Sequence, residues 1–574
     1  MNQTESATSA RTEDLSLADF AVFSTEELAV LARKLRLKMG RFGLRVCQDY
    51  YRAKKRIPRI EELLLLDSIV QETYERPDTL LLSEMITECD VIADTFADLM
   101  TRRSALQRPD KKPPSFAYLA QLMESWLTAN DEEDSSSPEI GVRFSAYRDL
   151  LLAADGYQRT ASSGTEETDV SIGVRSRQTA TDKQALTEGD YIYGILTQKE
   201  SDGAFLRTLA GFLSSAPLAT NAKTVTVVQN QKLLPLLIDM DCGITIYPEK
   251  IPGIERDLLS ALTLPFAGAI FAASPEKSAD LLLEAQENGL PIFLLAKVSS
   301  KGTVCIITDE SPLHYPLEFL QSLTFSRLCS ATVAAPSEGS IDVSLSRIGT
   351  CTLNGKRNAV VKIDASGTSP FRMGLLGVLY SLSHCIAAGA DIRTVKLATQ
   401  LSLSPDHVGE SLGAILGLYR AQAEFALRGN PPFVTVGKET HPTLSAVTLA
   451  PLPDYAIAST AVGNGTNIFY LEPLYTPDGI PDFDDLKRMY DYIGALMADN
   501  KVLSIRPTGE NLLADLEEMS KDVVVEYVPA SPIDSHIGGF LVEVASEIQG
   551  VLIAKTEAPH ADELENSDKS QADS

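Results

Sequence analysis

Apolar residues follow two different patterns along this chain, and each pattern predicts its own kind of structure. Between about residues 17 and 130, leucines recur at helical spacing, which predicts a helical module. From Gly189 onward, short runs rich in β-branched and aromatic residues alternate with amphipathic stretches, which predicts an α/β domain. The runs expected to form strands are 191–197, 223–229, 267–273 and 291–298.

The same alternation returns in the second half of the chain and matches the first in position. Residues 191–203 and 467–479 each predict a strand, then a loop ending in Asp-Gly, and then a helix. The glycines that follow are also spaced alike: 65 residues separate Gly203 from Gly268, and 60 separate Gly479 from Gly539. We infer an internal duplication of one α/β domain.

The segment between the two copies predicts a further, β-rich domain. Residues 343–353 and 358–364 predict strands, and residues 433–436 predict another. The stretch 371–389 predicts a helix that is apolar nearly all round, which is typical of a buried helix. A second helix is expected over 408–427.

Composition and charge exclude several classes of function. The chain has 574 residues, 44% of them hydrophobic, and a formal net charge of −27. The electric field of this negative charge repels nucleic acids and anionic membranes, so neither is expected as a partner. The seven cysteines form no C-x-x-C pair, and no apolar run reaches the roughly 20 residues that cross a bilayer. We expect a cytoplasmic protein with reduced thiols.

Common catalytic and metal motifs are missing from the sequence. The six histidines never recur at i, i+3 or i+4 with one another, so no zinc site is expected. VGKET at 436–440 resembles the end of a Walker A motif but has Pro432 in place of the first glycine and Glu439 in place of the hydroxyl residue. VGNGTN at 462–467 is either a partial dinucleotide fingerprint or a tight turn. The basic cluster at 52–59 is either a phosphate site or a solvated helix end.

Several longer stretches resemble one family. QDYYRAKKRIPRIEELLLLDSIVQETYER (48–76) is similar to the linker of phosphoribosylformylglycinamidine synthase, a purine-biosynthetic amidotransferase. SPFRMGLLGVLYSLSHCIAAGADIRTVKLATQLSL (369–403), SLGAILGLYRAQ (411–422) and DGIPDFDDLKRMYDYIGALMADNKVLSIRPTG (478–509) follow the second half of that family in order and at comparable spacing. The resemblance covers about two thirds of the chain.

The resemblance implies an α/β (α+β) fold with a helical N-terminal module and a duplicated aminoimidazole-ribonucleotide-synthetase-like unit whose first β-rich half is truncated. The expected domains are a disordered N-terminus (1–16), a helical module (17–130), a linker or vestigial β-rich half (131–188), a first α/β domain (189–325), a β-rich domain (326–455), a second α/β domain (456–556) and a disordered acidic tail (557–574).

The family's ATP-dependent reaction implies ATP and Mg²⁺ as cofactors, and motif positions imply the residues that bind them. Asp202 and Gly203 match the family's G-R-D-G loop, and Arg372 matches the arginine of its P-Y-R motif. Gly437, Lys438 and Glu439 match its G-G-K-D, with Glu439 as the metal candidate. Each pair also has a plainer interpretation, because Asp-Gly is common in turns and Lys-Glu on surfaces.

The sequence also departs from the family. Thr73 stands where the family has its catalytic histidine, the family's E-T-H-N-H-P strand has no counterpart, and no glutaminase domain is expected. The leading hypothesis is therefore a degenerate homologue that binds or regulates and is catalytically impaired. One alternative is an active synthase that takes ammonia from a separate glutaminase, and another is an oligomeric structural scaffold. The expected partners are a glutaminase subunit, the active synthase or a second copy of the chain.

Overall fold

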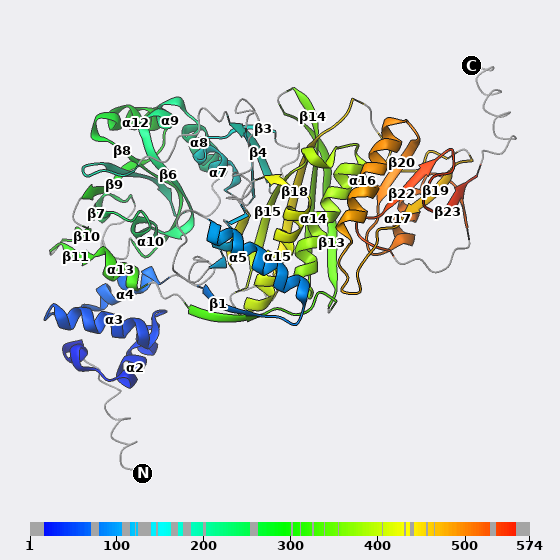
Figure 1. Cartoon of the computed structure of the whole chain (residues 1–574). Coiled ribbons are helices and arrows are strands. Elements are labelled where there is room, and N and C mark those ends of the chain that lie inside the picture. Colours follow the sequence, from blue (N-terminus) through cyan, green and yellow to red (C-terminus); the bar gives the residue numbers. More distant parts are fainter. Residues whose placement is uncertain are drawn as a thin grey trace, which may run out of the picture. The chain divides into compact units, whose positions relative to one another are not determined.

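The computed structural model divides the chain into two compact units (Figure 1). Unit 1 comprises Met1–Thr79 and Asp134–Arg327, and unit 2 comprises Leu80–Glu133 and Leu328–Ser574. The residues that the structure describes are 17–70, 80–105, 115–116, 118–120, 122–123, 139–144, 147–161, 170–175, 185–198, 203–252, 262–299, 302–309, 311–323, 327–337, 339–353, 355–404, 406–429, 432–436, 441–454, 457–463, 465–528 and 535–557.

Helices open the described part of unit 1. They are η1 (Leu17–Val22), α2 (Thr25–Leu35), α3 (Gly40–Ala53) and α4 (Ile60–Ile69). A capping box starts α2: Ser24 Oγ accepts the Glu27 amide (3.2 Å), and the Glu27 carboxylate accepts the Ser24 amide (2.7 Å). The buried Gln48 side chain donates to the carbonyls of Phe20 and Phe23, which ties η1 to α3.

The main sheet of unit 1 has, among the described residues, seven strands in the order β11-β10-β7-β9-β5-β8-β6. The strands are β5 (Tyr191–Thr197), β6 (Ala222–Lys232), β7 (Gly243–Ile246), β8 (Pro265–Ala273), β9 (Ile292–Ser299), β10 (Thr303–Ile306) and β11 (Leu313–Pro316). The strands predicted at 191–197, 223–229, 267–273 and 291–298 are therefore present. Burial on both faces explains their near-continuous apolar runs.

Separate apolar clusters cover the two faces of this sheet. Ile192 and Leu196 of β5 face a cluster that includes the N-terminal helices, whereas Tyr193 and Ile195 face the other cluster, because neighbouring side chains of a strand point to opposite faces. The helices of this domain are α8 (Gly203–Leu213), α9 (Ala216–Asn221), α10 (Leu233–Ile238), η4 (Pro248–Lys250), α12 (Pro275–Glu287) and α13 (Leu317–Ser322).

The segment over 131–188, for which the sequence left a linker or a shrunken β-rich half open, contains a small antiparallel sheet. Its described elements are β2 (Glu139–Phe144), α7 (Arg148–Ala154), β3 (Gln158–Ala161) and β4 (Val170–Arg175), with strand order β2-β4-β3. Val142 and Ile172 are buried in it, and Arg143 pairs with Asp155 (2.5 Å). The sequence did not predict β4, because β4 lies in the polar run 160–183, where few residues are apolar.

The predicted single helical module over 17–130 is divided between the units, because 80–133 belongs to unit 2. This part contains the strand β1 (Leu80–Ile86), which pairs with β12 (Arg327–Thr332), and the helix α5 (Asp90–Ala105). Asp98 of α5 accepts a 2.5 Å hydrogen bond from the Tyr419 hydroxyl. Pairing with a strand more than 240 residues away is a tertiary contact, which local periodicity does not report.

The β-rich part of unit 2 is a mixed sheet with two helices on one face. Within the described residues the strand order is β13-β14-β18-β15-β16, with β17 also pairing with β15. The elements are β13 (Ile341–Leu353), β14 (Lys356–Gly367), α14 (Pro370–Ala387), η5 (Ile392–Thr394), β15 (Lys396–Leu403), α15 (Val408–Glu424), β16 (Arg428–Gly429), β17 (Phe433–Val436) and β18 (Thr443–Pro451). The predicted buried helix is α14, in which every residue except Arg372 and Tyr380 is buried.

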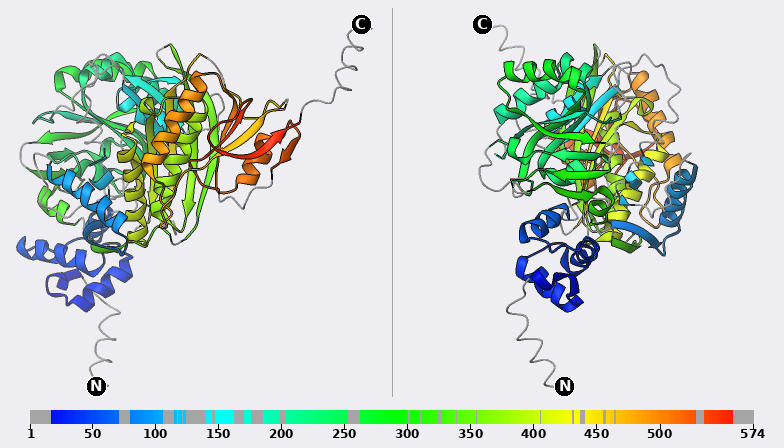
Figure 2. Two further views of the ribbon diagram at one scale, coloured as in Figure 1. Left: turned by 45° about the vertical axis from the view of Figure 1, so that its right-hand side comes forward. Right: turned by 90° about the vertical axis from the view of Figure 1, so that its left-hand side faces the viewer.

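Glycines let α14 and α15 pack closely side by side (Figures 1 and 2). A Cβ atom added to Gly417 of α15 would collide with the backbone oxygen of Phe371, and one added to Gly374 of α14 would collide with that of Ala414. Backbone atoms cannot move aside as a flexible side chain can. The two helices therefore touch backbone to backbone at these glycines.

Gly417→Ala is expected to lower the free energy of unfolding by about 1–3 kcal/mol, because the added methyl group must push the two backbones apart. The matched control is Gly494→Ala on the exposed face of another helix, where an added Cβ meets nothing within 4 Å. That change should raise the free energy of unfolding by about 0.5–1 kcal/mol, since alanine is the better helix former. Urea denaturation followed by circular dichroism measures both, and equal shifts would contradict the packing argument.

The second α/β sheet of unit 2 has, in the described residues, the strand order β20-β22-β19-β23-β21. Its elements are β19 (Asn467–Leu471), α16 (Phe483–Ala498), β20 (Val502–Pro507), α17 (Leu512–Met519), β21 (Val525–Tyr527), β22 (Phe540–Val544) and β23 (Val551–Thr556). Asp482 caps α16 by accepting the amides of Asp484 and Asp485. One face of the sheet packs with α14 and α16, and the other packs with α17.

The two α/β sheets share one topology. The order β7-β9-β5-β8-β6 in unit 1 corresponds strand for strand to β21-β23-β19-β22-β20 in unit 2, and all four neighbouring pairs in each set are antiparallel. Their irregularities also coincide, because the register shifts after Ile192 in β5 and after Ile468 in the matching β19. Duplication of one ancestral domain would leave this pattern.

Candidate functional site

The structure places two of the six residues that the sequence proposed for ligand binding. Asp202, Gly437, Lys438 and Glu439 lie outside the described residues, as does Thr73. Gly203 begins α8, and an added Cβ there would meet nothing within 4 Å, so the described surroundings do not require glycine. Gly203 belongs to unit 1 and Arg372 to unit 2, so each is considered in its own unit.

Arg372 lies in the first turn of α14, where the positive end of the helix dipole favours anions. Its side chain is 19% exposed, and its Nη2 lies 3.7 Å from Glu510 Oε1. Its Nε is buried and has no hydrogen-bond partner among the described residues. Since a buried donor without an acceptor costs about 1–3 kcal/mol, this nitrogen is a place where an added acceptor would be favourable.

The Asp-Gly turn of the second α/β copy packs against this arginine. Gly479 has φ +72°, and a Cβ added to it would lie 3.4 Å from Arg372 Nε. In the sequence, Gly479 occupies the position in its Asp-Gly loop that Gly203 occupies in the loop after residues 191–197. Arg372 and the second Asp-Gly each carry a signal in the sequence, but no signal indicates that they meet.

Loops from one edge of the second α/β sheet surround Arg372. β19 and β20 are both antiparallel to β22, so they are parallel to each other and the loops that follow them leave from the same edge. Hydrogen bonds join the loop after β20 to the segment before β22: Thr508 Oγ1 donates to the His536 carbonyl (2.7 Å), and Ser535 Oγ donates to the Gly509 carbonyl (2.7 Å). The loop positions are thus fixed by one another as well as by the sheet.

A stacked pair of aromatic rings lies beside the arginine. The rings of Tyr475 and His536 are 4.4 Å apart with an interplanar angle of 17°. The Tyr475 hydroxyl donates to the Ile537 carbonyl (2.7 Å). Burial raises the pKa of Tyr475 above its ordinary value, and the positive charge of Arg372 acts in the opposite direction. Tyr475 is therefore a neutral donor that holds the 535–539 loop.

A second polar cluster lies further along α14. Tyr380 and His384, one turn apart on α14, pack edge to face with ring centroids 4.7 Å apart. They face Arg506 of β20, whose Nε lies 3.8 Å from Asp515 Oδ1 of α17. His384 Nε2 and Arg506 Nε are both buried without a hydrogen-bond partner in the described part of the chain. Burial, together with the charge of Arg506, lowers the pKa of His384 to about 3.

This lowered pKa predicts a pH dependence of stability. The folded chain keeps His384 neutral down to about pH 3, whereas an unfolded histidine binds a proton below about pH 6.5. Protonation then favours the unfolded state, so stability should be lost as the pH falls from about 6.5 towards 3. His384→Gln should flatten this part of the profile, while the same change at the exposed His314 should leave it as in wild type. Urea denaturation at stepped pH values measures the slopes, and identical slopes for all three proteins would contradict the assignment.

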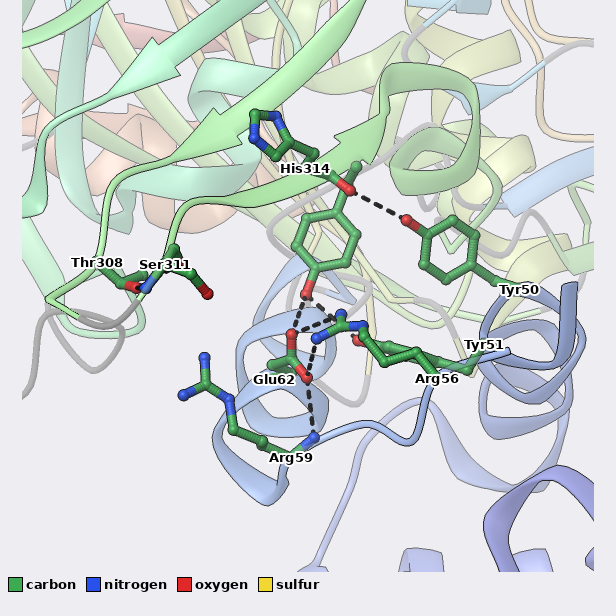
Figure 3. Close-up of polar contacts among 9 residues, drawn as sticks. Tyr50, Tyr51, Arg56, Arg59, Glu62, Thr308, Ser311 and His314 are labelled. Carbon is green, nitrogen blue, oxygen red and sulfur yellow. Dashed lines mark hydrogen bonds and ion pairs between the residues drawn. The ribbon is translucent and has the colours of Figure 1, made fainter. Parts of the chain in front are cut away.

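The basic segment of the N-terminal module is held by an internal carboxylate (Figure 3). Glu62 is fully buried and accepts two hydrogen bonds from Arg56, at 2.8 and 3.2 Å. Glu62 also accepts the Arg59 amide (2.9 Å) and the Tyr315 hydroxyl (3.2 Å). The charge of Arg56 is thereby neutralised within the chain. The described geometry favours the interpretation as a helix end over that as a phosphate site.

The VGNGTN loop likewise binds a group of its own chain. The amides of Val462 and Gly463 donate to the fully buried carboxylate of Glu543, at 2.8 and 2.9 Å. Thr466 Oγ1 and Ser504 Oγ donate to the same carboxylate, at 2.6 and 2.7 Å. Since this side chain occupies those amides, the loop is a turn built around Glu543, in keeping with the second of the two interpretations of the sequence.

Histidines that are distant in sequence come together beside α15. His407 and His441 both direct Nδ1 at Glu410, at 3.3 and 2.8 Å. Within the described ranges, no group of three or more His, Cys, Asp or Glu side chains is arranged to hold a metal ion. Of the helices that the structure describes, none combines the length and the apolar character needed to cross a membrane.

Comparison with known proteins gives a clear result only at the level of structure. No protein-family model matches the chain, and no curated protein matches its sequence. Solved structures of PurL, the phosphoribosylformylglycinamidine synthase of Thermotoga maritima, do match. The complex with FGAR is 12% identical and aligns over 90% of this chain and 100% of PurL, with a TM-score of 0.53.

Other structures of the same protein agree. The complex with ATP is 12% identical and covers 90% of this chain and 100% of PurL, with a TM-score of 0.51. The Thermotoga maritima PurLQS structure is 12% identical and covers 89% of this chain and 99% of that one, with a TM-score of 0.52. Identity this low carries information about the fold and not about activity. The chain therefore has the mixed α/β fold of phosphoribosylformylglycinamidine synthase, as the motif resemblance implied.

Proposed function

We propose that this chain is a divergent homologue of the purine-biosynthetic synthase that binds a phosphorylated ligand of the adenine-nucleotide class at Arg372, and that it acts as a binding or regulatory protein. The proposal includes an internal duplication, which the shared strand order and matching register shifts of the two α/β sheets support. It also includes a cytoplasmic location, in keeping with the charge and the scattered cysteines.

The observation that carries the proposal is the buried, unpartnered Nε of Arg372. A phosphate oxygen would accept this N–H in a charge-assisted hydrogen bond, and the N-terminal end of α14 would add its dipole. The turn at Gly479 packs against the guanidinium, where an added Cβ atom would lie 3.4 Å from Nε. Matching structures of PurL have been solved with ATP and with FGAR, both of which carry phosphate, which supports this class of ligand.

Glu439, the metal candidate of the sequence, lies outside the described residues, and no group of three or more His, Cys, Asp or Glu side chains within them is arranged to hold a metal ion. We therefore derive no step through a metal. Among the described residues, Arg372 supplies a positive charge and a hydrogen-bond donor, and the loops around it are held by hydrogen bonds to one another. These features suit ligand binding.

The sequence favours binding over catalysis because Thr73 occupies the position of the family's catalytic histidine. A threonine hydroxyl does not titrate near neutral pH, so it does not replace an imidazole as a general acid or base. One alternative is an active synthase, and the alignment of this chain with nearly the whole length of PurL supports it. The PurLQS structure of Thermotoga maritima shows that PurL is found with partner subunits. An oligomeric scaffold that binds no ligand is the third possibility.

The test is a calorimetric titration of ATP with magnesium into the full chain, first without and then with formylglycinamide ribonucleotide. Saturable binding is expected, and Arg372→Ala should weaken it by at least about tenfold, the worth of one charge-assisted hydrogen bond. Arg357→Ala, which removes an exposed arginine of β14, is the matched control and should bind as wild type.

Three outcomes separate the hypotheses. Binding without formation of ADP supports the binding homologue. Formation of ADP that depends on ammonia and the ribonucleotide supports the active synthase. A flat titration with both ligands, or an Arg372→Ala variant that binds as tightly as wild type, overturns the proposed site.

A further inference from the structure

A groove of about 350 Å³ opens at the far end of α14 from Arg372. An 18-residue helix is about 27 Å long, so this groove is a separate place in unit 2. It lies between the segment that follows α14 and one side of α16. The residues that line it are Ile386, Gly389, Ala390, Asp391, Ile392, Arg393, Tyr490, Asp491, Gly494, Ala495 and Met497.

Small residues, polar groups and three mostly buried apolar side chains line the groove. Ile386, Tyr490 and Met497 are buried and form the apolar surface. Gly389 ends α14 with φ +95°, and an added Cβ at Gly494 of α16 would meet nothing within 4 Å. A larger side chain at Gly494 would therefore fill the groove, whereas a Cβ atom at Gly389 would meet the Pro453 side chain at 3.0 Å. The volume is at the lower end of the range for small-molecule sites, which corresponds to a compact ligand.

The charges around the groove favour a cation. Arg393 forms a bidentate pair with Asp391, with Nε at 2.9 and 3.1 Å and Nη2 at 2.8 Å from the carboxylate oxygens, so these two charges cancel. Asp491 makes no ion pair within 4.0 Å in the described part of the chain, although Arg393 lies close enough to act on it electrostatically, so Asp391, Arg393 and Asp491 together carry one net negative charge. The C-terminal end of α14 adds its partial negative charge at the same place.

We propose that this groove binds a small organic cation: a protonated primary amine on an apolar body, with the ammonium group at Asp491 and the apolar part on Ile386, Tyr490 and Met497. An ammonium group donates up to three hydrogen bonds and suits a carboxylate beside helix carbonyls. A carboxylate or phosphate ligand would be repelled by Asp491 and by the helix end. The site does not depend on the function proposed for Arg372.

The test uses three probes of similar shape that differ in charge: 2-phenylethylamine, 2-phenylethanol and 3-phenylpropionate. Each is titrated into the full chain and followed by ligand-observed saturation-transfer NMR. The amine should bind on the order of tenfold more tightly than the alcohol, as one charge-assisted contact implies, and the carboxylate should not bind. Equal binding of amine and carboxylate would overturn the proposal.

Two variants locate the site. Asp491→Asn should bring the affinity for the amine down to that for the alcohol, because the charge is lost and the shape is kept. Gly494→Leu should abolish binding of both, because the new side chain fills the groove from an open position that tolerates it. The control is Gly211→Leu in α8, an equally open helical glycine of unit 1. Amine binding that survives Gly494→Leu would place the ligand elsewhere and refute the assignment.

Discussion

Glu543→Ala should lower the free energy of unfolding of this protein by about 3–5 kcal/mol. Glu543 lies in β22, between β19 and β20, and is fully buried. Its carboxylate accepts the amides of Val462 and Gly463 and the hydroxyls of Thr466 and Ser504. Removing it leaves three buried donors, the Gly463 amide and the hydroxyls of Thr466 and Ser504, without an acceptor, and each unpaired donor lowers the stability of the folded state.

The experiment on Glu543 has a nearby control. Glu547 is an exposed glutamate four residues further along, and Glu547→Ala should change stability by less than about 0.5 kcal/mol. Glu543→Gln keeps the shape but directs an NH₂ group at donors, so it should also destabilise. Urea denaturation monitored by circular dichroism compares the variants. A loss below about 1 kcal/mol for Glu543→Ala would mean that water replaces the carboxylate in the folded state.

The second large effect is expected at Glu62 in unit 1. Glu62→Ala should cost about 2–3 kcal/mol, less than a fully buried ion pair, because its partner Arg56 is 44% exposed and can return to water. The Arg59 amide and the Tyr315 hydroxyl lose their acceptor in the same change. Burial raises the pKa of Tyr315 and of Tyr51 above their ordinary value, so both hydroxyls remain protonated donors.

Glu61 provides the control for this position, since it is the preceding residue on the same helix and is exposed. Glu61→Ala should be nearly neutral. Because Tyr315 belongs to β11 and Glu62 to α4, the loss should also loosen the N-terminal helices from the hairpin β10–β11 (Figure 3). Hydrogen exchange should then show faster opening of α3 and α4. Unchanged exchange together with unchanged stability would refute the role assigned to Glu62.

Strands and helices with clear periodicity could be predicted from the sequence, and their positions were confirmed to within a few residues. The buried helix is one case: residues 371–389 are apolar all round, and α14 is buried on nearly every side. β1 and β4 were missed for different reasons. β1 lies within a leucine-rich helical pattern and depends on pairing with β12, whereas β4 lies in a polar run with few apolar residues.

For the candidate site, individual residues could be predicted from the sequence, but their positions relative to one another could not. Arg372 and the Asp-Gly turn at 478–479 were each recognised, one by its motif and one by the internal repeat. Their contact joins residues more than 100 positions apart, and neither residue carries a local signal for it. Three further residues of the site lie in loops: Tyr475, His536 and Glu510. Loops have no regular hydrophobic period, so the sequence pattern did not predict these residues.

By itself, the sequence determined the alternation of helices and strands, the repeated α/β pattern and the acidic charge. These follow from which residues are apolar and at what spacing, because burial of an apolar face is a local property of a helix or strand. Only the tertiary structure decided which buried charges are satisfied by the chain itself, as at Glu543 and Glu62, and which donor is left without a partner, as at Arg372. Hydrogen bonding depends on distances of a few ångströms between residues far apart in the chain, and the fold alone sets those distances.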